Sequence, residues 1–280
     1  DFFRTAGAFI ELLELTLKSH LLPMLRSGQA GDAVEALKFL VKAHHFNLPS
    51  ASQGLRASWA LVFCADAGLK EEVLKAFMLV HACEAGAEDP YDPSAFLPAG
   101  KVATNLTNVV RLASRSELTC LEEVLTVLVT QQMIPKGVFV ALRKGVLEAG
   151  KQTGEASKPD EASKRRGAQR ACAMHVLALC CSAPGAAAEV LGSGSVSALA
   201  DATLGKVASA GEASEGDWEL VRCVCLAVKK LASEKATSKT GSQKQPCFAW
   251  APKVVSLCGA VLRGEWVRSG SLAEEAGQGG

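Results

Sequence analysis

Histidines are the side chains of this sequence best suited to acid–base chemistry, and their spacing argues against a shared site. His44 and His45 are adjacent, so their rings diverge on a helix, while His20, His81 and His175 lie far from one another in the chain. A general base or a metal ligand needs partners held close by. We therefore interpret each histidine as an ordinary, partly buried helix residue.

The sequence contains no recognisable nucleophile or phosphate-binding motif. The run 192–195 lacks the Gly-Lys-Ser/Thr that completes a phosphate-binding loop, and it follows no predicted strand. No Gly-x-Ser-x-Gly elbow occurs, and Glu122 and Glu123 are expected on a solvated helix face without a pocket. We predict a protein that is not an enzyme, with no catalytic, cofactor-binding or metal-binding residues and no small-molecule substrate.

The ten cysteines show neither a disulfide framework nor the ligand spacing of a zinc site. The thiols of Cys223 and Cys225 would lie about 200° apart around a helix, which is poor geometry for a shared metal. Cys172, Cys180 and Cys181 also fall in apolar helical stretches. We interpret the cysteines as small buried hydrophobic residues in a reducing compartment.

Positive charge is distributed unevenly along the chain. The formal net charge of +1 argues against a globally basic nucleic-acid binder, so any DNA contact must come from local patches. Residues 221–253 hold seven basic residues and one acid, and residues 134–170 hold nine and four. Such side chains can neutralise phosphates, although solvation of an ordinary loop explains them equally well. The candidate DNA contacts are Lys164, Arg165, Arg166, Lys229, Lys230, Lys235, Lys239 and Lys244.

The sequence gives two further indications about the setting of the chain. No stretch approaches the roughly 18 consecutive apolar residues of a membrane span, so we expect no membrane association. The chain opens without a signal-peptide pattern and within a helical pattern, from which we expect a segment of a longer, intracellular protein.

Helical periodicity is the dominant pattern of the elements that carry these residues. Leu, Val and Ala supply most of the apolar content, which favours helices over sheets. Asp32 is predicted to cap a helix, Gly68 to end one, and Ser114 and Glu117 to form a capping box. Pro135 fits the first turn of a helix. The predicted helices include residues 32–45, 50–64, 70–83, 101–113, 168–182, 195–209 and 217–233.

These patterns predict an all-α fold, a HEAT- or armadillo-like α-solenoid of about eleven helices in antiparallel pairs. The pairs recur roughly every 35 to 50 residues, which is near the period of such repeats. A compact helical bundle is the structural alternative. The expected segments are helical repeats over 1–85, a Pro-rich linker over 86–100, helical repeats over 101–150, a polar loop over 151–167, helical repeats over 168–233, a basic flexible loop over 234–251, a terminal helix over 252–268 and a disordered tail over 269–280.

Four segments, in order, resemble the HEAT-repeat D-type regulatory subunits known as condensin complex subunit 1. They are Gly31–Val41, Leu69–Ala76, Cys120–Leu125 with Asn105-Leu106 ahead of it, and Val224–Val228 followed by a basic loop. The resemblance is good over residues 2–148, thinner over 168–230 and slight beyond Thr237. None of these segments is a catalytic signature.

The resemblance implies a non-catalytic scaffold subunit that binds a kleisin and the SMC ATPase pair. It also implies contact with DNA and chromatin in mitotic chromosome condensation, in the nucleus and on chromosomes, with a cytoplasmic phase in the cell cycle. The ATP chemistry would belong to the other subunits. The alternative is another α-solenoid adaptor, such as a transport or trafficking scaffold without DNA binding, and salt-sensitive DNA binding would distinguish the two.

Overall fold

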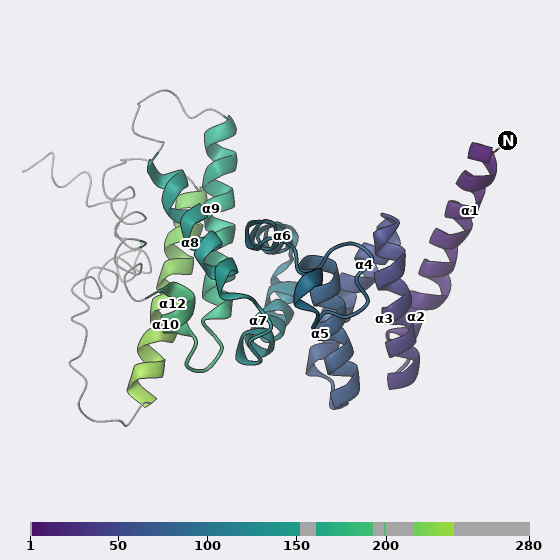
Figure 1. Ribbon diagram of the computed structural model, residues 1–280, viewed down its shortest axis with the longest axis horizontal. Helices are drawn as coiled ribbons and strands as arrows, with labels where there is room; N and C mark the ends of the chain where they lie inside the picture. The colour runs from purple at the N-terminus through teal and green to yellow at the C-terminus, as the bar shows by residue number, and fades with distance from the viewer. Residues whose placement is uncertain (1, 152–160, 193–198, 200–214, 238–280) are drawn as a thin grey trace, which may run out of the picture. The chain divides into compact units, whose positions relative to one another are not determined.

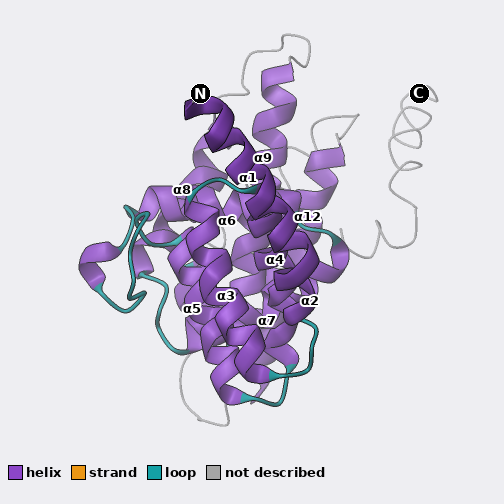
Figure 2. Cartoon of the chain, turned by 90° about the vertical axis from the view of Figure 1, so that its right-hand side faces the viewer, coloured by secondary structure: helices purple, strands orange, loops and turns teal. Residues whose placement is uncertain are grey.

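The fold is all-α, as predicted. The computed structural model describes residues 2–151, 161–192, 199 and 215–237 (Figure 1). Across these residues helices are joined by loops and no strand occurs, apart from an isolated bridge between Cys83 and Phe96 (Figure 2). The chain divides into two compact units, Asp1–Pro135 and Lys136–Gly280, and each is described by itself.

The first unit contains seven α-helices in its described residues, together with short π- and 3₁₀-helical turns. They are α1 Phe2–Thr16, a π-turn Leu17–Leu21, α2 Leu22–Met24, α3 Ala30–His45, α4 Pro49–Ser58, a 3₁₀ turn Trp59–Phe63 (η2), α5 Ala67–His81, a 3₁₀ turn Pro93–Ala95 (η3), α6 Ala99–Leu112 and α7 Arg115–Thr130.

Helix α3 packs against α2, α4 and α5. It turns back into α4 through Asn47, whose φ of 57° is tolerated by asparagine, and Pro49 then opens α4. Helix α3 also packs against α5, and the two helices run parallel. Lys38 of α3 lies near Glu72 of α5, and His44, further along α3, lies near His81 at the end of α5. Apolar side chains of these helices form a buried core that includes Leu37, Leu40, Ala51, Leu55, Leu69 and Val73.

A glycine allows α4 to approach its neighbours closely. A Cβ atom at Gly54 would lie 2.8 Å from Leu22 and 2.9 Å from both terminal methyl groups of Leu40, closer than real Cβ contacts. Leu40 is fully buried, so its side chain has little room to move away. The packing of α4 on α2 and α3 therefore requires a residue without a side chain at this position.

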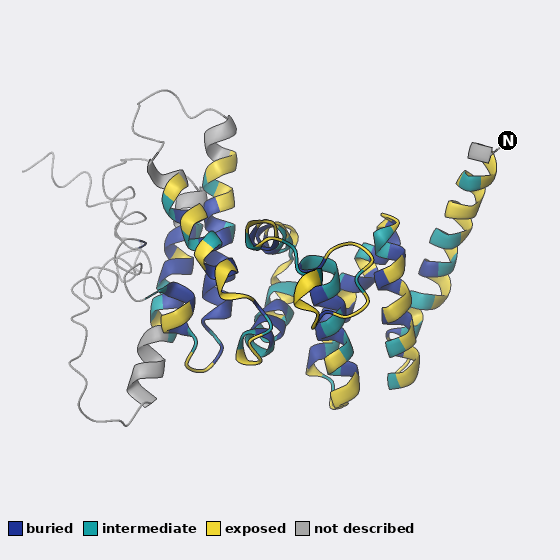
Figure 3. Cartoon of the chain, in the orientation of Figure 1, coloured by how far each residue is buried: buried dark blue, intermediate teal, exposed yellow. Residues whose placement is uncertain are grey.

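Helix α1 presents an apolar surface. Phe9, Ile10, Leu12 and Leu15 are each about half exposed or more, and much of the helix is coloured as exposed in Figure 3. Glu14 connects α1 to α4, because its carboxylate accepts hydrogen bonds from the Ser50 backbone N–H at 3.2 Å and from the Ser50 hydroxyl.

Helix caps agree with the sequence in one case and differ in two. Ser114 and Glu117 form the predicted capping box at the start of α7. The predicted cap at Asp32 is wrong, because α3 begins two residues earlier and Asp32 lies in its first turn. The predicted helix end at Gly68 is also wrong: α5 begins at Ala67, and Asp66 caps it by accepting from the Leu69 N–H at 2.8 Å.

The second unit contains α8 Lys136–Lys151, α9 Glu161–Cys180, α10 Ala187–Leu191 and α12 Glu215–Thr237 among its described residues. Helices α8 and α9 form an antiparallel hairpin (Figure 1), in which the buried Arg170 Nε donates to the Val146 carbonyl at 3.0 Å. Helix α9 packs most extensively on α12. These two helices run in the same direction, because His175 faces Glu219 while Lys230 reaches Ala178.

The end of α10 is held by an arginine. Arg143 Nη1 donates to the carbonyls of Glu189 at 3.0 Å and Val190 at 2.7 Å, which are acceptors left open where a helix ends. Gly192 follows with a φ of 69°, and a Cβ atom there would lie 3.1 Å from the Arg143 guanidinium. Glycine at this position therefore serves to end the helix.

Several expected segment boundaries change. Helix α9 begins at Glu161, so the predicted polar loop is wrong over 161–167, and α12 continues to Thr237, so the predicted basic loop is wrong over 234–237. The Pro-rich stretch ends where α6 begins at Ala99, and η3 lies within it. The helix predicted over 195–209 falls almost entirely outside the described residues, as do the terminal helix over 252–268 and the tail over 269–280.

Candidate functional site

A groove with a volume of about 290 Å³ opens in the first unit where α3, α4, α5 and α6 meet. Its polar lining comes from His44, Ser52, Arg56, His81, Asn105 and Asn108. Its apolar lining includes Trp59, Val109 and Leu112, of which Leu112 is 60% exposed. Apolar walls with a few convergent polar groups are typical of a ligand- or peptide-binding site.

Arg56 is the fixed cation of this groove. Its Nε donates to Glu117 Oε1 at 2.9 Å, and its Nη2 donates to Glu117 Oε2 at 2.7 Å and to the Leu112 carbonyl at 2.6 Å. This two-point contact holds the guanidinium plane in one orientation and joins α4 to α6 and α7. The hydrogen bonds from Arg56, and those from Ser114, lower the pKa of Glu117 to about 2.

The two histidines of the groove are neutral near pH 7. His81 is packed against Phe77, with ring centroids 4.7 Å apart, and burial together with the neighbouring His44 lowers its pKa to about 3. Burial also lowers the pKa of His44, whose Nδ1 lies 3.1 Å from the Ser52 hydroxyl. Asn105 Nδ2 donates to the His81 carbonyl at 3.0 Å, which fixes the amide at the groove wall. The groove therefore offers neutral hydrogen-bonding groups beside the Arg56–Glu117 ion pair.

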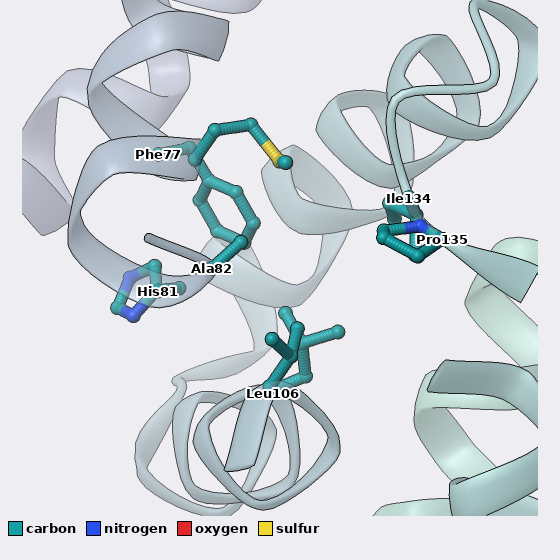
Figure 4. Close-up of a pocket in the computed structure, with 8 residues that line it drawn as sticks. Phe77, His81, Ala82, Leu106, Ile134 and Pro135 are labelled. Atoms are coloured by element: carbon teal, nitrogen blue, oxygen red, sulfur yellow. The ribbon is translucent and has the colours of Figure 1, made fainter. Parts of the chain in front are cut away.

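A second, much smaller cavity of about 10 Å³ also has His81 in its lining. In Figure 4 Phe77 and His81 lie on one side of it, Ile134 and Pro135 on the other, and Leu106 below. The space is about that of one water molecule, but its lining is almost entirely apolar. We interpret this cavity as a gap in packing and not as a ligand site.

The structure places the candidate DNA-contact residues on helices where it describes them. Lys164, Arg165 and Arg166 lie in the first turns of α9, and the last two are exposed; Lys229 is exposed on α12. Lys235 is also within α12. Lys239 and Lys244 lie outside the described residues. DNA contact by these residues remains a prediction.

Lys230 has a structural role that the amino-acid sequence did not indicate. Its Nζ donates to the Ala178 carbonyl at 3.1 Å and to the Ser182 hydroxyl. Ala178 is within the last turn of α9, where carbonyls lack helical partners and a cation is favourable. Lys230 therefore ties α12 to the end of α9, so its side chain is already engaged within the second unit.

Three potential metal ligands, which the sequence did not predict, lie together in the second unit. His175 on α9 and Glu219 and Cys223 on α12 bring one donor atom each to within 4.8 Å of one another. His175 Nδ1 lies 3.7 Å from Glu219 Oε1, and the Cys223 Sγ lies 3.7 Å from the same oxygen. His175 and Cys223 are buried. The ligands come from two helices distant in sequence, so no local spacing could reveal them.

No protein-family model and no curated protein sequence matches the chain. Among the described residues, no helix combines the length and the apolar character needed to cross a membrane.

Proposed function

We propose that the chain is a non-catalytic HEAT-repeat scaffold of the condensin type. Its role would be to bind kleisin and SMC partners and to contact DNA during mitotic chromosome condensation. The resemblance of four ordered segments supplies the identity of the partners. The packing of α3 with α4 and α5, in which hairpins stack on sequence neighbours, supports a solenoid arrangement.

The groove at α3–α6 is the single observation that carries the binding role. It combines an exposed apolar residue, Leu112, with Asn105, Asn108 and the fixed guanidinium of Arg56. Amides can pair with the backbone of an extended segment. We propose that this groove receives an extended segment of the kleisin.

Affinity of the full chain for the condensin kleisin, measured by calorimetry, tests this proposal. Leu112→Asp would place a charge in the groove without disturbing the core, because the side chain is already 60% exposed. We expect this change to weaken kleisin binding by at least about 10-fold, which corresponds to about 1.4 kcal/mol.

Val140→Asp is the matched control, since Val140 is a comparably exposed apolar residue of α8 outside the groove. It should leave the affinity unchanged. Equal effects of the two changes would exclude the groove as the kleisin site. Absence of any kleisin binding by the unaltered chain would contradict the proposed function itself and favour the alternative, a transport or trafficking adaptor.

A further inference from the structure

We propose that α9 and α12 together bind a zinc ion through His175, Glu219 and Cys223. This site is independent of the groove and of the condensin-type function proposed above. It would join two helices that are distant in the sequence and run side by side in the second unit (Figure 1).

The donor atoms are already close to tetrahedral spacing. Zinc bonds of about 2.0–2.2 Å to nitrogen and oxygen and about 2.3 Å to sulfur place neighbouring donors about 3.4–3.6 Å apart. The His175 Nδ1 to Glu219 Oε1 distance is 3.7 Å, and so is the Cys223 Sγ to Glu219 Oε1 distance. All three donors lie within 4.8 Å of one another. Zinc binding therefore requires donor movements of about 1 Å or less.

The helical register explains why these donors meet. Glu219 and Cys223 are four residues apart on α12, so they lie on the same face, one turn apart, opposite His175 on α9. Cys172 lies three residues before His175 on α9 but is not one of the three clustered donors, so the fourth position of the metal is assigned to water.

The ligand chemistry selects zinc among common metal ions. Calcium and magnesium prefer sets made of oxygen, whereas a thiolate, an imidazole and a carboxylate suit zinc. The Cys223 thiol has to lose its proton to bind zinc, because the thiolate is the form that ligates the metal. On binding, the Zn–S bond forms, the S–H bond breaks, and the proton leaves to solvent.

Arg222 competes with zinc for the carboxylate oxygens of Glu219. Its Nε donates to Glu219 Oε2 at 2.8 Å, and its Nη2 donates to Oε1. The arginine side chain is 53% exposed, so it can rotate away from Oε1 and keep Oε2. An outer partner of this kind orients a carboxylate ligand.

The test is zinc binding by the full chain, purified under reducing conditions, with Co²⁺ as the spectroscopic probe. We expect one zinc per chain by elemental analysis. Co²⁺ should give a thiolate-to-cobalt charge-transfer band and the intense visible bands of tetrahedral coordination. Cys223→Ser should weaken zinc binding by at least about 100-fold, because loss of an outer partner alone costs about 10–100-fold.

Cys225→Ser is the matched control, since Cys225 lies on the same helix two residues away and outside the cluster. It should bind zinc as the unaltered chain does. The Co²⁺ spectrum of the unaltered chain decides the question even if Cys223→Ser fails to fold. A spectrum without thiolate ligation, or equal zinc binding by Cys223→Ser and the unaltered chain, would overturn the site.

Discussion

Arg56 shows how one side chain can serve both stability and a binding surface. Its guanidinium joins Glu117 on α7 to the end of α6, and the same residue lines the groove. The interaction is partly shielded from water, since the two side chains are 36% and 24% exposed. It is therefore worth more than an ordinary surface ion pair.

Glu117→Gln is expected to lower the free energy of unfolding by about 1–3 kcal/mol, because it removes the charge that pairs with Arg56 and weakens the capping box of α7. Urea unfolding at pH 7 measures the change. Glu123→Gln, a similar change further along α7, should alter stability by less than about 0.5 kcal/mol. Equal effects would show that the Arg56 pair is not stabilising.

His81 predicts a dependence of stability on pH. Its folded pKa of about 3 is below the ordinary value of 6.5, so the unfolded chain binds more protons between these two values. The contribution of His81 is fully present above pH 6.5 and is lost as the pH falls towards 3. We expect a loss of about 1–2 kcal/mol between pH 7 and pH 5. Urea unfolding at both values measures it.

His81→Gln removes the titrating ring and should reduce this pH dependence to the part that His44 contributes, since burial lowers the pKa of His44 as well. His20→Gln is the control, because His20 lies outside the groove, and it should leave the dependence in place. An identical slope in His81→Gln would contradict the assignment of the loss to His81.

At the scale of elements, one of the three predicted helix-end signals is confirmed, and the other two are wrong. The Ser114–Glu117 capping box needs only residues three positions apart, and it is confirmed. The cap at Asp32 was wrong because Ala30 and Gly31 also adopt helical geometry, and the start of α9 was missed because a charged, polar sequence can still be helical. Sequence could not show the groove or the His175 cluster, since both depend on which helices pack together.

Two of the helical glycines, Gly54 and Gly145, should respond in opposite ways to alanine. Gly54→Ala is expected to destabilise the chain by about 1–3 kcal/mol, since the new methyl group would overlap Leu22 and Leu40. Gly145→Ala should stabilise it by about 0.5–1 kcal/mol, because nothing lies within 4 Å and alanine favours a helix. Thermal or urea unfolding compares them. Stabilisation by both would contradict the close approach of α4.

At the scale of the whole molecule, charge is close to balanced, so DNA binding must be local. Changing Arg165, Arg166 and Lys229 to Glu should weaken duplex DNA binding. It should also reduce the slope of log K against log salt by about 0.9 for each phosphate that the protein no longer neutralises. Fluorescence anisotropy over a salt titration measures both quantities.

The control changes the net charge equally within the first unit, through Arg26, Lys42 and Lys101 to Glu, all of which are exposed. These changes should have much smaller effects. Equal reductions in affinity for the two sets would mean that overall charge, and not the basic helices of the second unit, determines DNA binding.

The most direct test of the condensin-type function is affinity purification of the full-length protein from dividing cells, with every co-purifying subunit identified and quantified. We predict an SMC pair and a kleisin in amounts comparable to the protein itself. Their absence, with vesicle-coat or transport proteins in their place, would contradict the proposed function and leave only the helical fold.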